Sequence, residues 1–147
     1  MSIYSIATSG LSAASLRVNV AASNVANTRT TGPLPASGGS SAGTGSSSAS
    51  SSYPAAYVPL RVDQVAQSSG STPAGTSAIV STVSPSYVAQ SDPSAPFANQ
   101  DGLVAAPNVD LADQFVQLAA AKYSFIANAK VIQAYSETEK SLLDIKT

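Results

Sequence analysis

Apolar side chains in the first 25 residues recur at steps of four and three, the spacing of one continuous stripe along an α-helix. The other faces are mostly Ser and Asn, and Arg17 is the only charged residue among them. We expect this helix to end within residues 24–32, because Asn tolerates the left-handed C-cap conformation and Pro33 cannot continue a helix. The stripe consists of Ile3, Ala7, Leu11, Ala14, Val18, Ala21 and Val25.

A second long helical pattern begins at Asp110, a residue type that caps helix N-termini well. Its apolar positions form two stripes that are rotated relative to each other, so this helix is apolar around much of its circumference. At about 1.5 Å per residue it would extend over about 50 Å, and the N-terminal helix over about 40 Å. The first stripe contains Leu111, Phe115, Leu118, Phe125, Ala129 and Ile132, and the second contains Val131, Tyr135, Leu142 and Ile145.

The middle of the chain combines a Ser/Gly-rich tract with short strand patterns. Residues 36–52 lack the apolar side chains that would offset the entropy of ordering, so we expect a disordered loop there. Two or three strands are expected within 53–67 and 77–90, separated by a long hairpin loop at 69–76. Asp101-Gly102 suits a tight turn, which would lead into a short strand at 103–105.

These patterns predict an α+β fold in which two long terminal helices pair as a coiled-coil-like layer, with a small β-rich module between them in sequence. The module is too small and polar to cover both helices, so we expect their stripes to bury against each other and against other copies. The alternative is an intramolecular helical hairpin that packs on its own β-rich module. The expected segments are 1–32 (N-terminal helix and Asn/Thr turn), 33–56 (Ser/Gly-rich loop), 57–109 (β-rich module) and 110–147 (C-terminal helix).

Composition argues against several classes of function. Only 10% of the residues are charged, the net charge is −1 and the basic residues are scattered, so we expect no nucleic-acid binding. The absence of His and Cys rules out Ser-His-Asp and Cys-His catalysis, and we expect no enzyme. The glycines lack a following Lys-Ser/Thr and the acidic residues lack calcium-loop spacing, so neither a cofactor nor a metal is expected. No apolar run is long enough for a membrane span, and the N-terminus does not match a secretory signal peptide.

Both ends of the chain resemble the flagellar axial proteins, the family of rod, hook and hook–filament junction subunits. In the N-terminal signature of that family, a helix with Ser-Gly-Leu/Met-Ser-Ala runs into Asn-x-Ala-Asn-x-x-Thr. The more specific block, residues 92–118 followed by Asn128 and residues 141–145, resembles proximal rod proteins of the FlgC type. The matching residues are Ser9, Gly10, Leu11, Ser12, Ala13, Asn24, Ala26, Asn27, Thr28 and Thr30, then Asp92, Pro93, Ser94, Pro96, Ala98, Asn99, Asp101, Gly102, Val104 and 107–110.

The resemblance implies a structural subunit of the bacterial flagellar basal-body rod, which self-assembles through its terminal helices into a helical tube that transmits motor torque. It also implies a periplasmic location, copies of the chain and other rod proteins as partners, and passage through the flagellar type III export apparatus. A secreted interaction or adhesin-like module without catalytic activity is the alternative, and a small enzyme domain is a further one. The predicted assembly interface consists of Leu11, Val18, Asn24, Val25, Asn27, Phe115, Leu118, Phe125, Asn128, Ile132 and Leu142.

Overall fold

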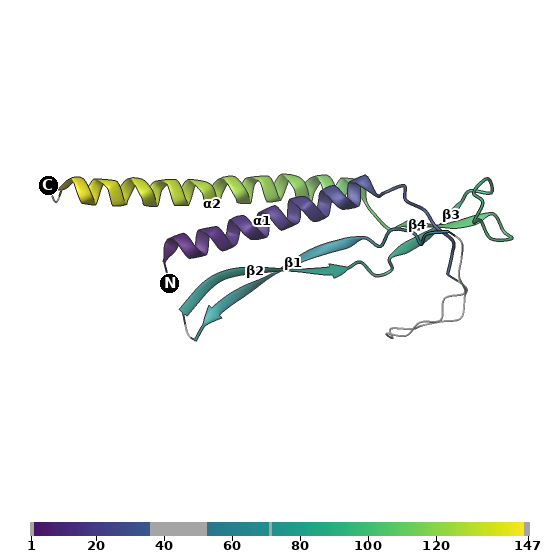
Figure 1. Ribbon diagram of the computed structural model, residues 1–147, viewed down its shortest axis with the longest axis horizontal. Coiled ribbons are helices and arrows are strands. Elements are labelled where there is room, and N and C mark those ends of the chain that lie inside the picture. The colour runs from purple at the N-terminus through teal and green to yellow at the C-terminus, as the bar shows by residue number, and fades with distance from the viewer. Residues whose placement is uncertain (1, 36–52, 71, 146–147) are drawn as a thin grey trace. The chain divides into compact units, whose positions relative to one another are not determined.

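The computed structural model describes residues 2–35, 53–70 and 72–145, and the loop predicted at 36–52 lies outside them. In these residues, two long helices lie at the two ends, and four strands between them in sequence form two two-stranded sheets, β1–β2 and β3–β4. This is the predicted α+β architecture (Figure 1). The elements are α1 (Ile3–Ala26), β1 (Leu60–Ser69), β2 (Thr72–Thr82), β3 (Tyr87–Ser91), β4 (Leu103–Pro107) and α2 (Leu111–Ile145).

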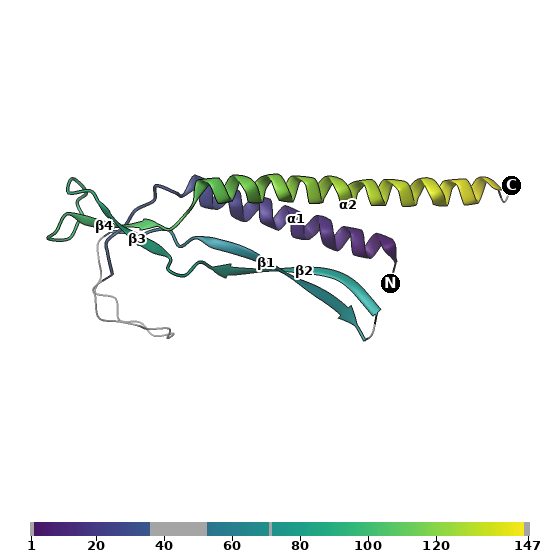
Figure 2. The ribbon, with the colours of Figure 1, turned by 180° about the vertical axis from the view of Figure 1, so that it is seen from behind.

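The chain folds into two compact units, which are described separately. The first unit combines α1, the β1–β2 hairpin and α2, and the second contains β3 and β4 with the segment that follows α1. Within the first unit, α1 lies between α2 and the hairpin in both views (Figures 1 and 2). Segments from the beginning, middle and end of the sequence therefore build one structure.

Small side chains line the buried side of α1. Its buried residues are alanines apart from two, and this allows backbones of neighbouring elements to approach closely. The helix ends near the predicted position, but among the described residues only glycines have a positive φ. The predicted left-handed Asn C-cap is therefore wrong, and a turn in which Thr30 N donates to Asn27 O at 3.0 Å follows the helix instead. The buried residues are Ala7, Ala13, Ala14, Val20, Ala21 and Asn24.

The β1–β2 hairpin corrects the prediction of a long loop at 69–76. Strand β2 begins at Thr72, so most of that Gly/Pro-containing stretch is extended and paired with β1. Gly75 has a φ of 108° and packs directly against Ser9 of α1, whose Oγ accepts a hydrogen bond from Thr76 N at 3.1 Å. Glycine is used here for close approach of a helix to a strand, which composition alone does not distinguish from a loop.

Strand β4 is the buried centre of the second unit. It pairs antiparallel with β3, with Ala89 opposite Ala105, and Gly32 forms a bridge to Ala105 on the other edge. The two hydrogen bonds between Gly32 and Ala105 measure 3.0 and 2.9 Å. The predicted turn is present, with Gly102 at a φ of 72°, and the predicted strand continues to Pro107.

Helix α2 begins as its sequence predicts, directly after Asp110. The Asp110 carboxylate accepts a hydrogen bond from Ala112 N at 2.8 Å, which satisfies one of the free N–H groups of the first turn. Ala121 is its only fully buried residue, although the helix carries many large apolar side chains. The chain therefore buries little of the apolar surface of α2.

Candidate assembly interface

Asn24 connects α1, β1 and α2 within the first unit. Its side chain is 2% exposed; Nδ2 donates to Leu60 O at 2.7 Å and to Gln114 Oε1 at 2.9 Å, and Oδ1 accepts from Leu60 N at 3.1 Å. One amide thereby joins α1 to the start of β1 and to the first turns of α2. An Asn on an Ala/Ser-rich helix is normally interpreted as a surface residue or a cap. The spacing of residues therefore does not predict that Asn24 connects α1 to β1 and α2.

The two helices pack antiparallel through small and polar residues. A side chain on Gly10 would lie 2.6 Å from Asn128 Oδ1, and Asn128 Nδ2 is bonded to Ser124 O at 2.8 Å. Gly10 and Asn24 are 14 residues apart, as are their opposite residues Asn128 and Gln114. The helices therefore stay in register over about 21 Å, with Gly10 allowing the close approach.

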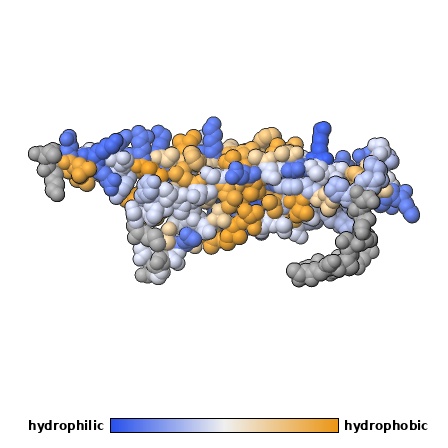
Figure 3. Space-filling view, viewed as in Figure 1, coloured by the Kyte–Doolittle hydropathy of each residue, from blue (hydrophilic) through white to orange (hydrophobic). Residues whose placement is uncertain are grey.

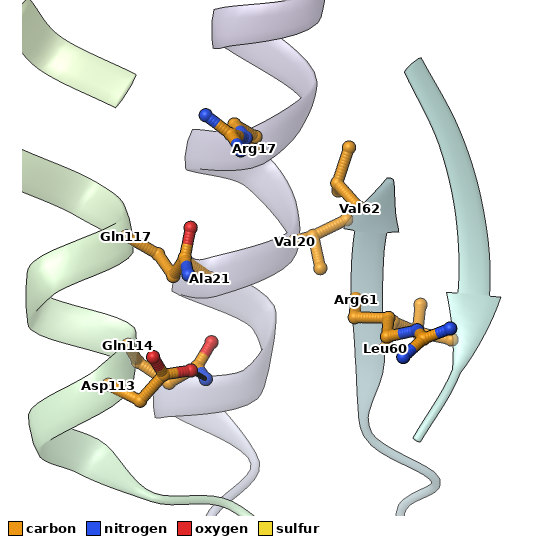
Figure 4. A pocket seen from close by; sticks show the side chains of 9 residues that line it. All are labelled: Arg17, Val20, Ala21, Leu60, Arg61, Val62, Asp113, Gln114 and Gln117. Atoms are coloured by element: carbon orange, nitrogen blue, oxygen red, sulfur yellow. Dashed lines mark hydrogen bonds between the residues drawn. The ribbon is translucent and has the colours of Figure 1, made fainter. Parts of the chain in front are cut away.

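A polar pocket of about 110 Å³ lies where α1, α2 and β1 meet (Figure 4). Arg17 is the only charged residue of α1, and its Nε is buried without a hydrogen-bond partner among the described residues. The pocket is too small for anything beyond solvent or a small ion, and it holds no arrangement of a nucleophile and a base. Its lining consists of Arg17, Val20, Ala21, Leu60, Arg61, Val62, Asp113, Gln114 and Gln117.

A larger groove between the same two helices is mainly apolar. Its volume is about 610 Å³, and both helices contribute side chains to it. We call it the apolar groove and define it by Ser15, Val18, Asn19, Leu118, Lys122, Phe125 and Ile126.

Large apolar side chains cover the outward faces of α2. Phe115 is 60% exposed, Val116 64% and Tyr123 72%, while the small residue Ala121 is completely buried. Figure 3 shows patches of apolar surface between hydrophilic side chains along this helix. The α2 helix thus packs on α1 with small and polar groups and presents its large apolar groups outward.

The predicted interface residues occupy different environments in the structure. Asn24 and Asn128 make contacts between elements of the first unit, and Asn27 lies in the turn after α1. Of the others, Phe115, Phe125 and Leu142 are exposed, whereas half-buried positions are occupied by Leu11, Val18, Val25, Leu118 and Ile132. Contacts with other copies remain a prediction for all of them.

The motif residues of the second unit form its turns. Asn99 Oδ1 accepts hydrogen bonds from Leu103 N at 2.8 Å and Asp101 N at 3.0 Å, and Asp92 N donates to Gly102 O at 2.9 Å. Asn108 Nδ2 donates to Pro85 O at 2.9 Å just before the Asp110 cap. These hydrogen bonds fix the backbone of the β3–β4 connection and of the segment that precedes α2. The role of the motif residues is therefore to position the backbone.

Features that would bind a metal ion or cross a membrane are absent from residues 2–35, 53–70 and 72–145. No group of three or more acidic side chains is placed to hold a metal ion there. In this part of the chain, neither helix is long and apolar enough to cross a membrane.

Comparison with known families matches both ends of the chain. Residues 5–33 match the model described as flagella basal body rod protein, and residues 100–145 match flagellar basal body rod FlgEFG protein C-terminal. The search of curated proteins finds no match. The two matched regions contain all of α2, most of α1 and the Asn/Thr turn, and so both partners of the Gly10–Asn128 and Asn24–Gln114 contacts. The chain therefore belongs to the flagellar basal-body rod protein family and is a structural component of the flagellar basal-body rod.

Proposed function

We propose that the chain is a rod subunit that self-assembles through α1 and α2 into a helical tube and transmits motor torque. The observation that carries this proposal is the outward-facing apolar surface of α2, where Phe115, Val116 and Tyr123 are each at least 60% exposed. Exposed apolar surface of this kind marks sites of association. Neighbouring subunits would cover this surface, and each pair of helices would become part of a continuous tube.

Resistance to twisting needs subunits that do not deform internally. The Asn24 amide joins three elements, and the Gly10–Asn128 contact holds the helices together further along their length. Close packing through small residues leaves little room for the helices to slide. These contacts support a role in transmitting force.

The position of the subunit is part of the same proposal. We place it in the periplasmic, proximal part of the rod, with copies of itself and other rod proteins as neighbours, delivered through the flagellar type III export apparatus. The motifs at 92–110 support the proximal position. Segments 1–32 and 110–147 would form the inner layer, and residues 36–52 would be dispensable for assembly. We propose no catalytic, nucleic-acid-binding or cofactor-dependent activity.

The direct test is removal of the chain from a flagellated cell that encodes it. We expect basal bodies without a complete rod and non-motile cells, with motility restored by the intact chain. An epitope-tagged copy should be found in the rods of purified basal bodies. Normal rods in the deletion strain would contradict the proposal.

A single substitution separates assembly from folding. Because Phe115 is 60% exposed, Phe115→Ala should change the free energy of unfolding of the isolated chain by less than about 0.5 kcal/mol. In the rod, loss of a buried Phe should weaken each contact by about 2 kcal/mol and reduce motility strongly. Thermal unfolding and swimming assays measure the two effects, with Ser136→Ala on the same helix as the control. Unchanged swimming would exclude Phe115 from the interface.

A further inference from the structure

Helix α2 extends beyond the start of α1. With Gly10 opposite Asn128 in an antiparallel pair, Ile3 lies opposite Tyr135, so residues 138–145 have no part of α1 beside them. Figures 1 and 2 both show this end of α2 continuing past α1. We call residues 138–145 the overhang.

The overhang carries apolar residues that the chain leaves uncovered. Leu142 is 63% exposed, Leu143 is 68% exposed and Ile145 is 81% exposed. Leu142 and Ile145 are three residues apart and share a helix face, which is the arrangement of an amphipathic helix that enters a groove. The overhang cannot fold back onto its own helix pair without breaking α2, so its partner must be another chain.

The apolar groove matches the overhang in chemistry. Val18, Leu118, Phe125 and Ile126 give it an apolar lining, and Lys122 adds a positive charge. Glu139 lies one turn before Leu142 and Leu143 on the overhang, so it supplies the opposite charge beside the apolar residues. Apolar contact would provide affinity, and the charge pair would favour one orientation.

We propose that the overhang of one copy docks into the apolar groove of a second copy, so that successive copies join head to tail. This inference rests on the proposed function and specifies which surfaces meet in the rod. The surfaces that meet differ from each other, and such a contact can repeat without closing on itself, as helical filaments require. Lys122 and Leu142 are 20 residues apart on α2, so neighbouring copies would be displaced by about 30 Å along the helix.

Cross-linking tests the contact in assembled rods. The chain contains no Cys, so Val18→Cys in the groove and Leu142→Cys on the overhang each introduce a single thiol. We expect a strain that expresses both single variants to form a disulfide-linked dimer on oxidation of its basal bodies, with the peptides of residues 18 and 142 joined. Ser68→Cys, at an exposed position of β1, replaces Leu142→Cys as the matched control and should give at least about tenfold less product.

Charge exchange tests orientation in the same preparation. Lys122→Glu or Glu139→Lys alone should lower the cross-linked fraction by up to about fivefold, and both together should restore it. Basal bodies that contain the variants but lack the 18–142 link, or that link either thiol to a different rod protein, would overturn the head-to-tail contact and leave the rod function standing. Absence of the intact chain from basal bodies would instead refute the proposed function.

Discussion

Asn24→Ala should lower the free energy of unfolding by about 2–4 kcal/mol, since it removes three hydrogen bonds at once. The substitution leaves the N–H and C=O of Leu60 and the side-chain oxygen of Gln114 without their partner. Urea unfolding of the purified chain, followed by helical circular dichroism, measures the loss. Rods built from this variant should be few or absent, because α1 would no longer be fixed to both β1 and α2.

Two further variants show whether the amide itself is responsible. Asn24→Asp keeps the acceptor for Leu60 N but cannot donate to Leu60 O or Gln114, so it should also be strongly destabilised. Asn19→Ala removes an exposed Asn from the same helix and should cost less than about 0.5 kcal/mol. Equal stability of the Asn24→Ala and Asn19→Ala variants would refute the bridging role.

Gly32→Ala should destabilise the second unit by about 1–3 kcal/mol, because an added side chain meets backbone that cannot easily yield. The new Cβ would lie 2.7 Å from the carbonyl carbon of Ala55, 2.9 Å from Pro54 O, and in contact with Ala56 N. Relief would require moving Gly32 away from Ala105 and weakening the bridge to β4. Urea unfolding measures the change, and amide exchange at Ala105 reports the bridge.

The other neighbour of Ala105 offers a matched control. Ala89 pairs with Ala105 from β3 and is exposed, so Ala89→Val adds more atoms than Gly32→Ala without meeting packed backbone. Its effect should stay within about 0.5 kcal/mol. A larger loss from Ala89→Val than from Gly32→Ala would show that close approach at Gly32 does not limit this sheet.

The elements with strong local signals were predictable. The stripe from Ile3 to Val25 corresponds to α1, Asp110 caps α2 as its residue type favours, and Asp101-Gly102 forms the expected turn. In each case a few adjacent residues determine the backbone conformation through periodicity, capping or a positive φ. Local chemistry was sufficient there.

The contacts between elements were not predictable from the same patterns. From sequence alone Gly75 is expected in a loop, because its contact with Ser9 is not visible there. Asn24 is likewise expected to be a helix cap, because its hydrogen bonds to Leu60 and Gln114 join segments that are distant in sequence. Helix α2 is apolar on several faces, so periodicity cannot choose which face meets α1. The structure places Ala121 there and leaves Phe115 exposed, because small side chains permit the closest approach.

The order of segments in the first unit has a consequence for the timing of folding. Asn24 and Gln114 are 90 residues apart in sequence, and Asn24 and Leu60 are 36 apart. Closing such long loops delays native contacts, and chains dominated by distant contacts fold slowly. An unfolded chain that begins to fold therefore passes through an interval in which α1 has no partner. Under the proposed self-assembly through α1, a growing assembly would compete kinetically with the chain's own α2 for the same helix during that interval.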